Sequence, residues 1–172
     1  TRVLTHCQFI NGPEVTALEA ALADYTGAKH VVTCASGTDA LLMVLMAKGV
    51  GRGDAVFCPS FTFCATGEAV ALTGAVPVFV DVDPVTLHID LSRVADALNP
   101  ATKAVIPVHL AGLGVDLKAL REVVGANVRI IEDAAHALPT ITTGDQVGGC
   151  RYSDAAVFSF YATKTITTGE GG

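Results

Sequence analysis

The sequence predicts an α/β fold in which a mostly parallel sheet carries helices on both faces. Short apolar runs alternate with helical patterns along the chain, the runs are continuously apolar, and polar residues follow most of them. Strands that are apolar on both faces are typical of parallel sheets buried between two layers of helices. With 172 residues, 51% of them hydrophobic, the chain is long enough for one domain with a sizeable core.

The elements follow from this pattern in order. A helical stripe over residues 14–25 comes after the turn Asn11-Gly12-Pro13. Each later apolar run is short and ends in polar or glycine-containing sequence that opens the next segment. The predicted strands are residues 30–35, 55–59, 76–80, 104–110, 128–131 and 155–160. The later predicted helices are one ending at residue 47, one ending near residue 72, residues 92–98 and residues 116–124.

Composition excludes several classes of function. A net charge of −6 and no cluster of Lys or Arg argue against nucleic acid as a partner. No apolar run approaches the ~20 residues that span a bilayer, and no secretory signal opens the chain. The cysteines form no C-x-x-C pair and no metal-ligand spacing, so we expect free thiols, no metal site and a cytoplasmic location. Because only 16% of residues are charged, we expect another domain or a partner subunit to cover part of the surface.

Ligands of open parallel sheets bind at the carboxyl ends of the strands, so the residues that follow each strand are the candidate site. Gly37 and Thr38 come after the first predicted strand and open a helix, where free N–H groups and a hydroxyl suit a phosphate. An ordinary helix N-cap has the same sequence. Phe63, after the second strand, suits stacking on a planar ring, although such an aromatic also suits the core.

Polar residues also follow the later strands. Asp133 ends a buried strand, where a carboxylate needs a cation such as a protonated ring nitrogen, or else caps the next turn. His136 suits a phenolic oxygen or a structural hydrogen bond, and Ser159 suits the phosphate or a backbone hydrogen bond. Lys164 follows the last strand, where desolvation of its amine favours the neutral nucleophile of Schiff-base chemistry. Together these groups are what pyridoxal 5′-phosphate (PLP) requires.

The sequence resembles the DegT/StrS-type nucleotide-sugar aminotransferases, which are fold type I PLP enzymes. The similarity runs over nearly the whole chain and is most specific toward its C-terminal end. The matching segments are residues 9–15, 35–41, 59–63, 81–83, 132–137 and 158–172, which include Glu132-Asp133-Ala134-Ala135-His136-Ala137.

The resemblance implies a role for each candidate residue. It implies that Lys164 forms the Schiff base with PLP, Asp133 pairs with the pyridine nitrogen, and His136 contacts the ring hydroxyl. It also implies that Phe63 stacks on the ring, and that the phosphate is held by Gly37, Thr38 and Ser159. Some relatives replace the lysine with histidine and dehydrate sugars, so a lysine here favours transamination. His109 matches a recurrent feature of the family but receives no role.

The family also implies what lies around this sequence. Its members are about twice as long, so residues 1–172 are expected to be part of the large PLP-binding domain, without the C-terminal small domain. They act on nucleotide sugars, take the amino group from a donor such as glutamate, and form homodimers. Other reactions on a nucleotide sugar, such as dehydration, and a non-catalytic PLP-binding protein stay open. A dinucleotide-binding module is a further alternative, but the G-x-G-x-x-G that it requires after the first strand is absent.

Overall fold

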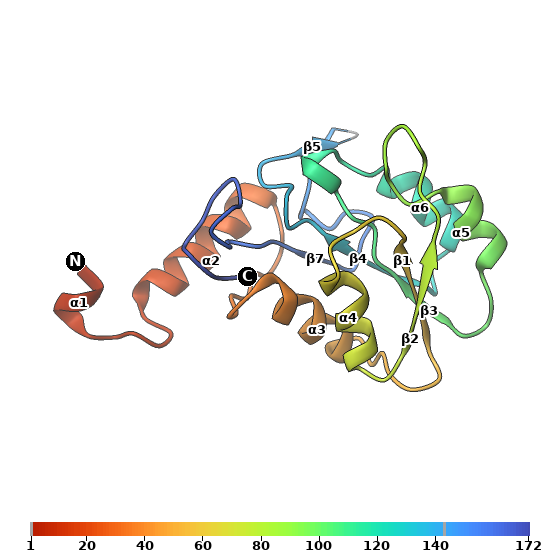
Figure 1. The fold of residues 1–172 in the computed structure, drawn as a ribbon. Helices are drawn as coiled ribbons and strands as arrows, with labels where there is room; N and C mark the ends of the chain where they lie inside the picture. Colours follow the sequence, from red (N-terminus) through yellow and green to blue (C-terminus); the bar gives the residue numbers. More distant parts are fainter. Residues whose placement is uncertain (1, 143) are drawn as a thin grey trace.

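The computed structural model describes residues 2–142 and 144–172, and five strands formed by these residues make one parallel sheet (Figure 1). The order across the sheet is β2-β1-β3-β4-β7. Every neighbouring pair is parallel, which confirms the predicted α/β class. The strands are β1 (Ala55–Pro59), β2 (Val76–Val80), β3 (Thr102–Val105), β4 (Arg129–Asp133) and β7 (Ala155–Val157).

Helices cover both faces of the sheet. Successive residues of each strand point to opposite faces, so each strand contributes side chains to both helix layers. On β1, Val56 and Cys58 pack with α3 (Gly37–Ala47) and α4 (Ala65–Leu72), whereas Phe57 packs with α5 (Leu91–Ala97) and α6 (Leu117–Val124). The strand β4 repeats this alternation, with Ile131 on the first face and Ile130 on the second. The two apolar clusters account for the continuously apolar strands in the sequence.

Polar side chains fix where several of these helices begin. The Ser36 side chain accepts a hydrogen bond from the Asp39 amide at the start of α3, and Asp116 accepts one from the Ala119 amide at the start of α6. Gly125 ends α6 with a φ of 72°, a conformation that glycine adopts without strain. These caps lie within a residue or two of the predicted helix ends.

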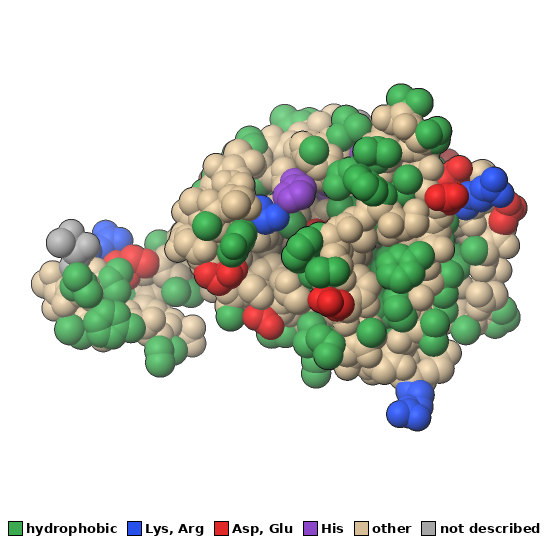
Figure 2. Space-filling model, in the orientation of Figure 1, with side chains coloured by type: hydrophobic (Ala, Val, Ile, Leu, Met, Phe, Trp, Pro, Cys, Tyr) green, Lys and Arg blue, Asp and Glu red, His purple; other side chains and the backbone are tan. Residues whose placement is uncertain are grey.

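The N-terminal segment extends away from the sheet (Figure 1). It consists of α1 (Arg2–His6), which the sequence did not predict, a connecting stretch, and the long α2 (Pro13–Thr26). Leu4, Phe9 and Ile10 are all largely exposed there, and hydrophobic side chains cover much of this segment in Figure 2. Apolar residues in such a position are typical of a surface that another part of an assembly covers.

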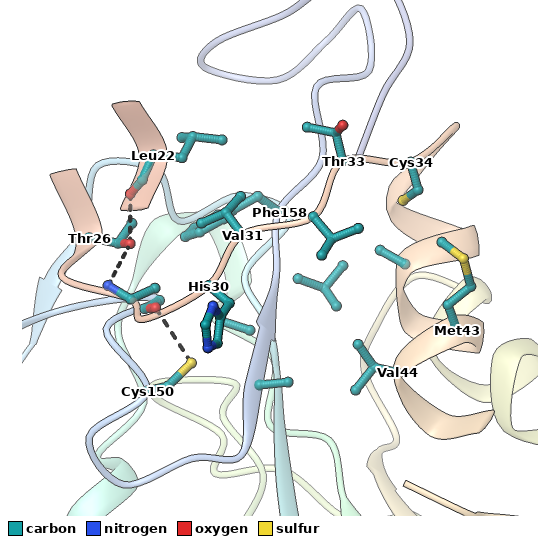
Figure 3. Close-up of a pocket in the computed structure, with 18 of the residues that line it drawn as sticks. Leu22, Thr26, His30, Val31, Thr33, Cys34, Met43, Val44, Cys150 and Phe158 are labelled. Atoms are coloured by element: carbon teal, nitrogen blue, oxygen red, sulfur yellow. Dashed lines mark hydrogen bonds between the residues drawn. The ribbon is translucent and has the colours of Figure 1, made fainter. Parts of the chain in front are cut away.

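The predicted strand at residues 30–35 is wrong. The segment is extended, but among the described residues its backbone-to-backbone hydrogen bonds are limited to a reciprocal pair between Cys34 and Gly172, at 2.9 and 3.2 Å, while the Thr33 amide donates to the Glu19 side chain. A cleft of about 520 Å³ separates it from the free edge of β7, and apolar side chains such as Val31, Val44 and Phe158 line that cleft (Figure 3). The β-branched composition therefore predicted the extended backbone correctly, but it does not encode pairing with a neighbouring strand.

Smaller differences concern element ends. The strands β3 and β7 are shorter than predicted, and after β3 the chain makes a bridge at Val108 and a 3₁₀ turn (Leu110–Gly112). A short hairpin of β5 (Ile141–Thr142) and β6 (Asp145–Gln146) was not predicted. None of the helices formed by the described residues combines the length and apolar character that a membrane crossing requires. The described residues also hold no group of three or more His, Cys, Asp or Glu side chains placed for a metal ion.

Candidate active site

A cavity of about 720 Å³ opens at the carboxyl ends of the strands. This volume lies within the ~300–1,000 Å³ that is typical of small-molecule sites. Every residue that the sequence predicted for the site lines it, namely Gly37, Thr38, Phe63, Asp133, His136, Ser159 and Lys164. The structure therefore brings Lys164 and Asp133, which are far apart in the sequence, to the same cavity.

The N-terminus of α3 forms one wall of the cavity. Ser36 caps the helix, and no described residue accepts a hydrogen bond from the amides of Gly37 and Thr38. A Cβ atom on Gly37 would lie 3.0 Å from the Ser159 Cβ and 3.3 Å from the Phe158 carbonyl oxygen, so glycine allows the helix to approach the end of β7 closely. Two free amides, the positive end of the helix dipole and the Thr38 and Ser159 hydroxyls make this wall suited to an anion.

Asp133 ends β4 and is almost completely buried. Its Oδ2 accepts a hydrogen bond of 2.9 Å from Thr66 Oγ1, and its Oδ1 accepts one of 3.3 Å from the Ala135 amide. Thr62 Oγ1 lies 2.8 Å from Thr66 Oγ1 and donates to it, since the Thr66 proton is directed to Asp133. These hydrogen bonds fix the direction of the carboxylate and leave it capacity to accept another hydrogen bond.

Sequence reasoning missed Thr62 and Thr66. The signal was present, because the two threonines stand four residues apart, with Thr62 just before α4 and Thr66 in its first turn, and their hydroxyls meet at 2.8 Å. What the sequence did not reveal is that the first turn of this helix meets the end of β4, where Thr66 contacts Asp133. Glu170 was also missed. It lines the same cavity, with its Oε1 accepting a hydrogen bond of 3.1 Å from the Gly171 amide.

His136 and Lys164 lie close enough to interact electrostatically. Partial burial of the imidazole and the positive charge of Lys164 lower the pKa of His136, while the negative charge of Asp133 acts in the opposite direction. At neutral pH His136 is therefore an uncharged imidazole that offers one donor and one acceptor. Burial and the charge of Asp133 raise the pKa of the Cys58 thiol to about 12, so this cysteine remains an uncharged core residue.

Phe63 is not a core residue, since 71% of it is exposed while it lines the cavity. An aromatic ring left open at the edge of a cavity is available to stack on a planar ligand. Taken together, the cavity offers an anion-binding helix end, a buried acid, a neutral imidazole, an open aromatic ring and a lysine amine. These groups fit a planar, phosphorylated heterocycle that carries a carbonyl group, and they define an α/β protein of the PLP-binding class.

Comparison with known proteins identifies the family. Residues 1–172 match the DegT/DnrJ/EryC1/StrS aminotransferase family, and the chain belongs to it. Over 99% of its length the chain is 47% identical to the UDP-2-acetamido-2-deoxy-3-oxo-D-glucuronate aminotransferase of Pseudomonas aeruginosa, and it covers 48% of that protein. The family assignment confirms the resemblance found in the sequence.

Solved structures agree with this assignment. DesV of S. venezuelae, solved in complex with a ketimine intermediate, superposes with a TM-score of 0.93 at 39% identity, with 99% of this chain and 46% of that chain covered. The PLP form of Spr1654, a putative sugar aminotransferase from Streptococcus pneumoniae, gives a TM-score of 0.89 at 34% identity, with 94% of this chain and 45% of that chain covered. The chain thus spans about half the length of the relatives it matches.

Proposed function

We propose that this chain is part of a PLP-dependent aminotransferase that transfers an amino group from an amino acid, such as glutamate, to a nucleotide-linked keto-sugar. The observation that carries the proposal is the meeting of Lys164 and Asp133 in one cavity whose wall is the free N-terminus of α3. A lysine, an acid and an anion-binding helix end are the three groups that hold the aldehyde, the ring nitrogen and the phosphate of PLP. Family membership and the PLP form of Spr1654 support the same conclusion.

Each residue has a distinct task in this proposal. Gly37, Thr38 and Ser159 bind the phosphate, Phe63 stacks on the ring, and His136 contacts the ring hydroxyl. Asp133, aimed by Thr66, accepts a hydrogen bond from the protonated ring nitrogen and holds the proton there. PLP, when bound, supplies a carbonyl that takes up the amino group and a ring that accepts electrons from the bond being broken.

Lys164 holds the cofactor and then moves a proton. Once the donor amine has displaced it, the Lys164 Nζ is free to remove the proton from the donor's α carbon as a general base. The same amine would then deliver that proton to the cofactor carbon that carries the amino group, so one residue would both remove and return the proton. His136 contributes no competing positive charge near Lys164, because burial and Lys164 itself lower the pKa of the imidazole.

The remaining features of the whole protein belong to the same proposal. Residues 1–172 form part of the large, PLP-binding domain, and a small domain lies outside them. The exposed apolar side chains of the N-terminal segment, Leu4, Phe9 and Ile10, support a homodimer.

The substrate class is supported by the nucleotide sugar in the name of the Pseudomonas aeruginosa relative. All five cysteines are free thiols, which supports a cytoplasmic location, and neither nucleic acid nor a membrane is a proposed partner.

The absorbance spectrum of the full-length protein tests the proposal. With PLP we expect a band near the visible edge that bleaches when glutamate is added, and a Lys164→Ala variant that lacks both the band and turnover. Gly51→Ala is the control, since a Cβ atom there meets only the Thr73 carbonyl oxygen at 3.8 Å. A band that persists in Lys164→Ala would refute the role of the lysine. Consumption of the sugar without consumption of the donor would indicate dehydration instead.

A further inference from the structure

A buried polar cluster lies directly behind Asp133 and has no part in the function described above. Glu132 is 1% exposed and His109 is 0% exposed. The Glu132 Oε2 lies 3.0 Å from the His109 Nε2, and its Oε1 accepts a hydrogen bond from the Ser153 hydroxyl. The three residues come from the segment after β3, from β4 and from the segment before β7, and so they join neighbouring strands.

The hydrogen bonds determine where the protons of this cluster lie. The His109 Nδ1 accepts a hydrogen bond of 3.0 Å from the Val115 amide, so that nitrogen carries no proton. The ring proton is therefore on Nε2, where it is donated to Glu132. With a second donor in Ser153, both oxygens of Glu132 act as acceptors, as in the ionised carboxylate. His109 is uncharged in this arrangement, so the cluster holds one net negative charge.

This charge lies on the opposite face of β4 from Asp133. Ile130 packs in the cluster with α5 and α6, and Ile131 packs in the cluster with α3 and α4. By the alternation of the strand, Glu132 shares the face of Ile130, while Asp133 shares the face of Ile131 and meets Thr66 of α4. A buried charge at this position acts through protein rather than through water, so solvent screens it only weakly.

We propose that Glu132 is a second acidic group for the cofactor: its carboxylate, held ionised by His109 and Ser153, adds to the field of Asp133 and favours the protonated ring nitrogen. Glu132 is a positioning residue in the electrostatic sense, because it contacts neither cofactor nor substrate. This inference rests on the proposed function, since it requires PLP to bind beside Asp133. It gives a purpose to a buried carboxylate whose desolvation costs free energy that the hydrogen bonds from His109 and Ser153 offset.

The other titratable groups around the two carboxylates do not cancel this effect. Near Glu132 they are His109, which is uncharged, and the Cys150 thiol, whose pKa is raised by burial and by the charge of Glu132. Farther out are His88, whose pKa is lowered by burial, Lys48, and Asp154, which is paired with two arginines. Near Asp133 they are Cys58, His136 and Lys164, and the carboxylate of Glu170 lines the same cavity. The thiol and the imidazole are uncharged at neutral pH, and Lys164 is the residue proposed to join the cofactor. Asp133 and Glu132 are thus the two negative charges that the end of β4 brings to this part of the site.

The test uses the full-length protein loaded with ¹⁵N-labelled PLP, in which the ¹⁵N chemical shift reports the protonation of the ring nitrogen. At a separation on the order of 10 Å and an effective dielectric constant of about 20, one charge shifts a titration midpoint by about one pH unit. We therefore expect Glu132→Gln, whose amide oxygen can accept from His109 while its NH2 group donates to the Ser153 hydroxyl, to lower the pH of ring-nitrogen deprotonation by about one unit. Measuring it also in an Asp133→Asn background brings the titration into an accessible range.

The matched control is Asp116→Asn, which removes the same charge from an exposed position on the same side of the sheet and keeps the cap of α6. We expect no shift in this variant. A Glu132→Gln titration that coincides with its parent would overturn the inference, as would an Asp116→Asn shift of equal size. In the wild-type protein, a ¹³C carboxyl signal of Glu132 in the protonated form at neutral pH would overturn it without any substitution. If no PLP binds to the wild type, the proposed function itself fails.

Discussion

The hydrogen bond from Thr66 to Asp133 gives a sharp test of how the acid is held. Thr66 is completely buried, and valine has the same shape without the hydroxyl. Thr66→Val removes two hydrogen bonds: the one donated to the Asp133 carboxylate, worth about 2 kcal/mol, and the one accepted from Thr62, worth about 1 kcal/mol. We therefore expect the free energy of unfolding to fall by about 3 kcal/mol.

A double-mutant cycle separates these two contributions. Thr62→Val breaks only the second hydrogen bond and should cost about 1 kcal/mol. The double variant loses the same two hydrogen bonds as Thr66→Val and should cost about 3 kcal/mol, not the sum of about 4 kcal/mol. Thr66→Ser is the control, because it keeps the hydroxyl and both hydrogen bonds and removes only the methyl group.

The assay is urea denaturation of the cofactor-free, full-length protein, followed on the transition that unfolds this domain. Leaving out PLP removes the stabilisation that a bound ligand adds, so the difference reports the hydrogen bonds alone. The reasoning would be refuted by a Thr66→Val variant as stable as the wild type, or by costs of the two single variants that simply add in the double variant.

Two further predictions concern the wall of the cavity and the edge of the sheet. Gly37→Ala should weaken PLP binding several-fold in an absorbance titration, because its Cβ would lie 3.0 Å from the Ser159 Cβ and push α3 away from β7. The control Gly51→Ala should bind PLP normally, and equal affinities of the two variants would contradict this prediction. Asp154→Asn should lower the free energy of unfolding by about 2 kcal/mol at neutral pH, since Asp154 holds two arginine side chains at 2.9 and 2.8 Å. Burial acts to raise the pKa of Asp154, but its hydrogen bonds outweigh burial and hold the pKa below the usual 3.8. The stabilisation by Asp154 is thus fully present above its unfolded-state pKa of 3.8 and is lost as the pH falls through the lower folded-state pKa. The free energies of unfolding of the wild type and the variant should therefore converge in acid. A difference that persists there would argue against the ion pairs.

Much of the fold could be predicted because its signals are local. The bounds of β1 and β2 follow directly from runs of apolar residues between turn residues, and α3 and α6 begin at capping side chains. The same locality explains the wrong strand at residues 30–35. An extended, β-branched segment has the same sequence whether or not a second strand lies beside it.

By itself the sequence determined which residues lie at the rim of the sheet, because in a parallel sheet each strand delivers the residue after it to the same edge. That rule was enough for Asp133 and Lys164, whereas Gly37 lies at the same rim although the segment before it is not a strand of the sheet. The tertiary structure alone decided what stands around them: the helix that carries Thr66 across the end of β4, and the face on which Glu132 meets His109. Contacts of this kind depend on how separate elements cross in space, and side-chain pairs from different elements leave no periodic trace along the chain.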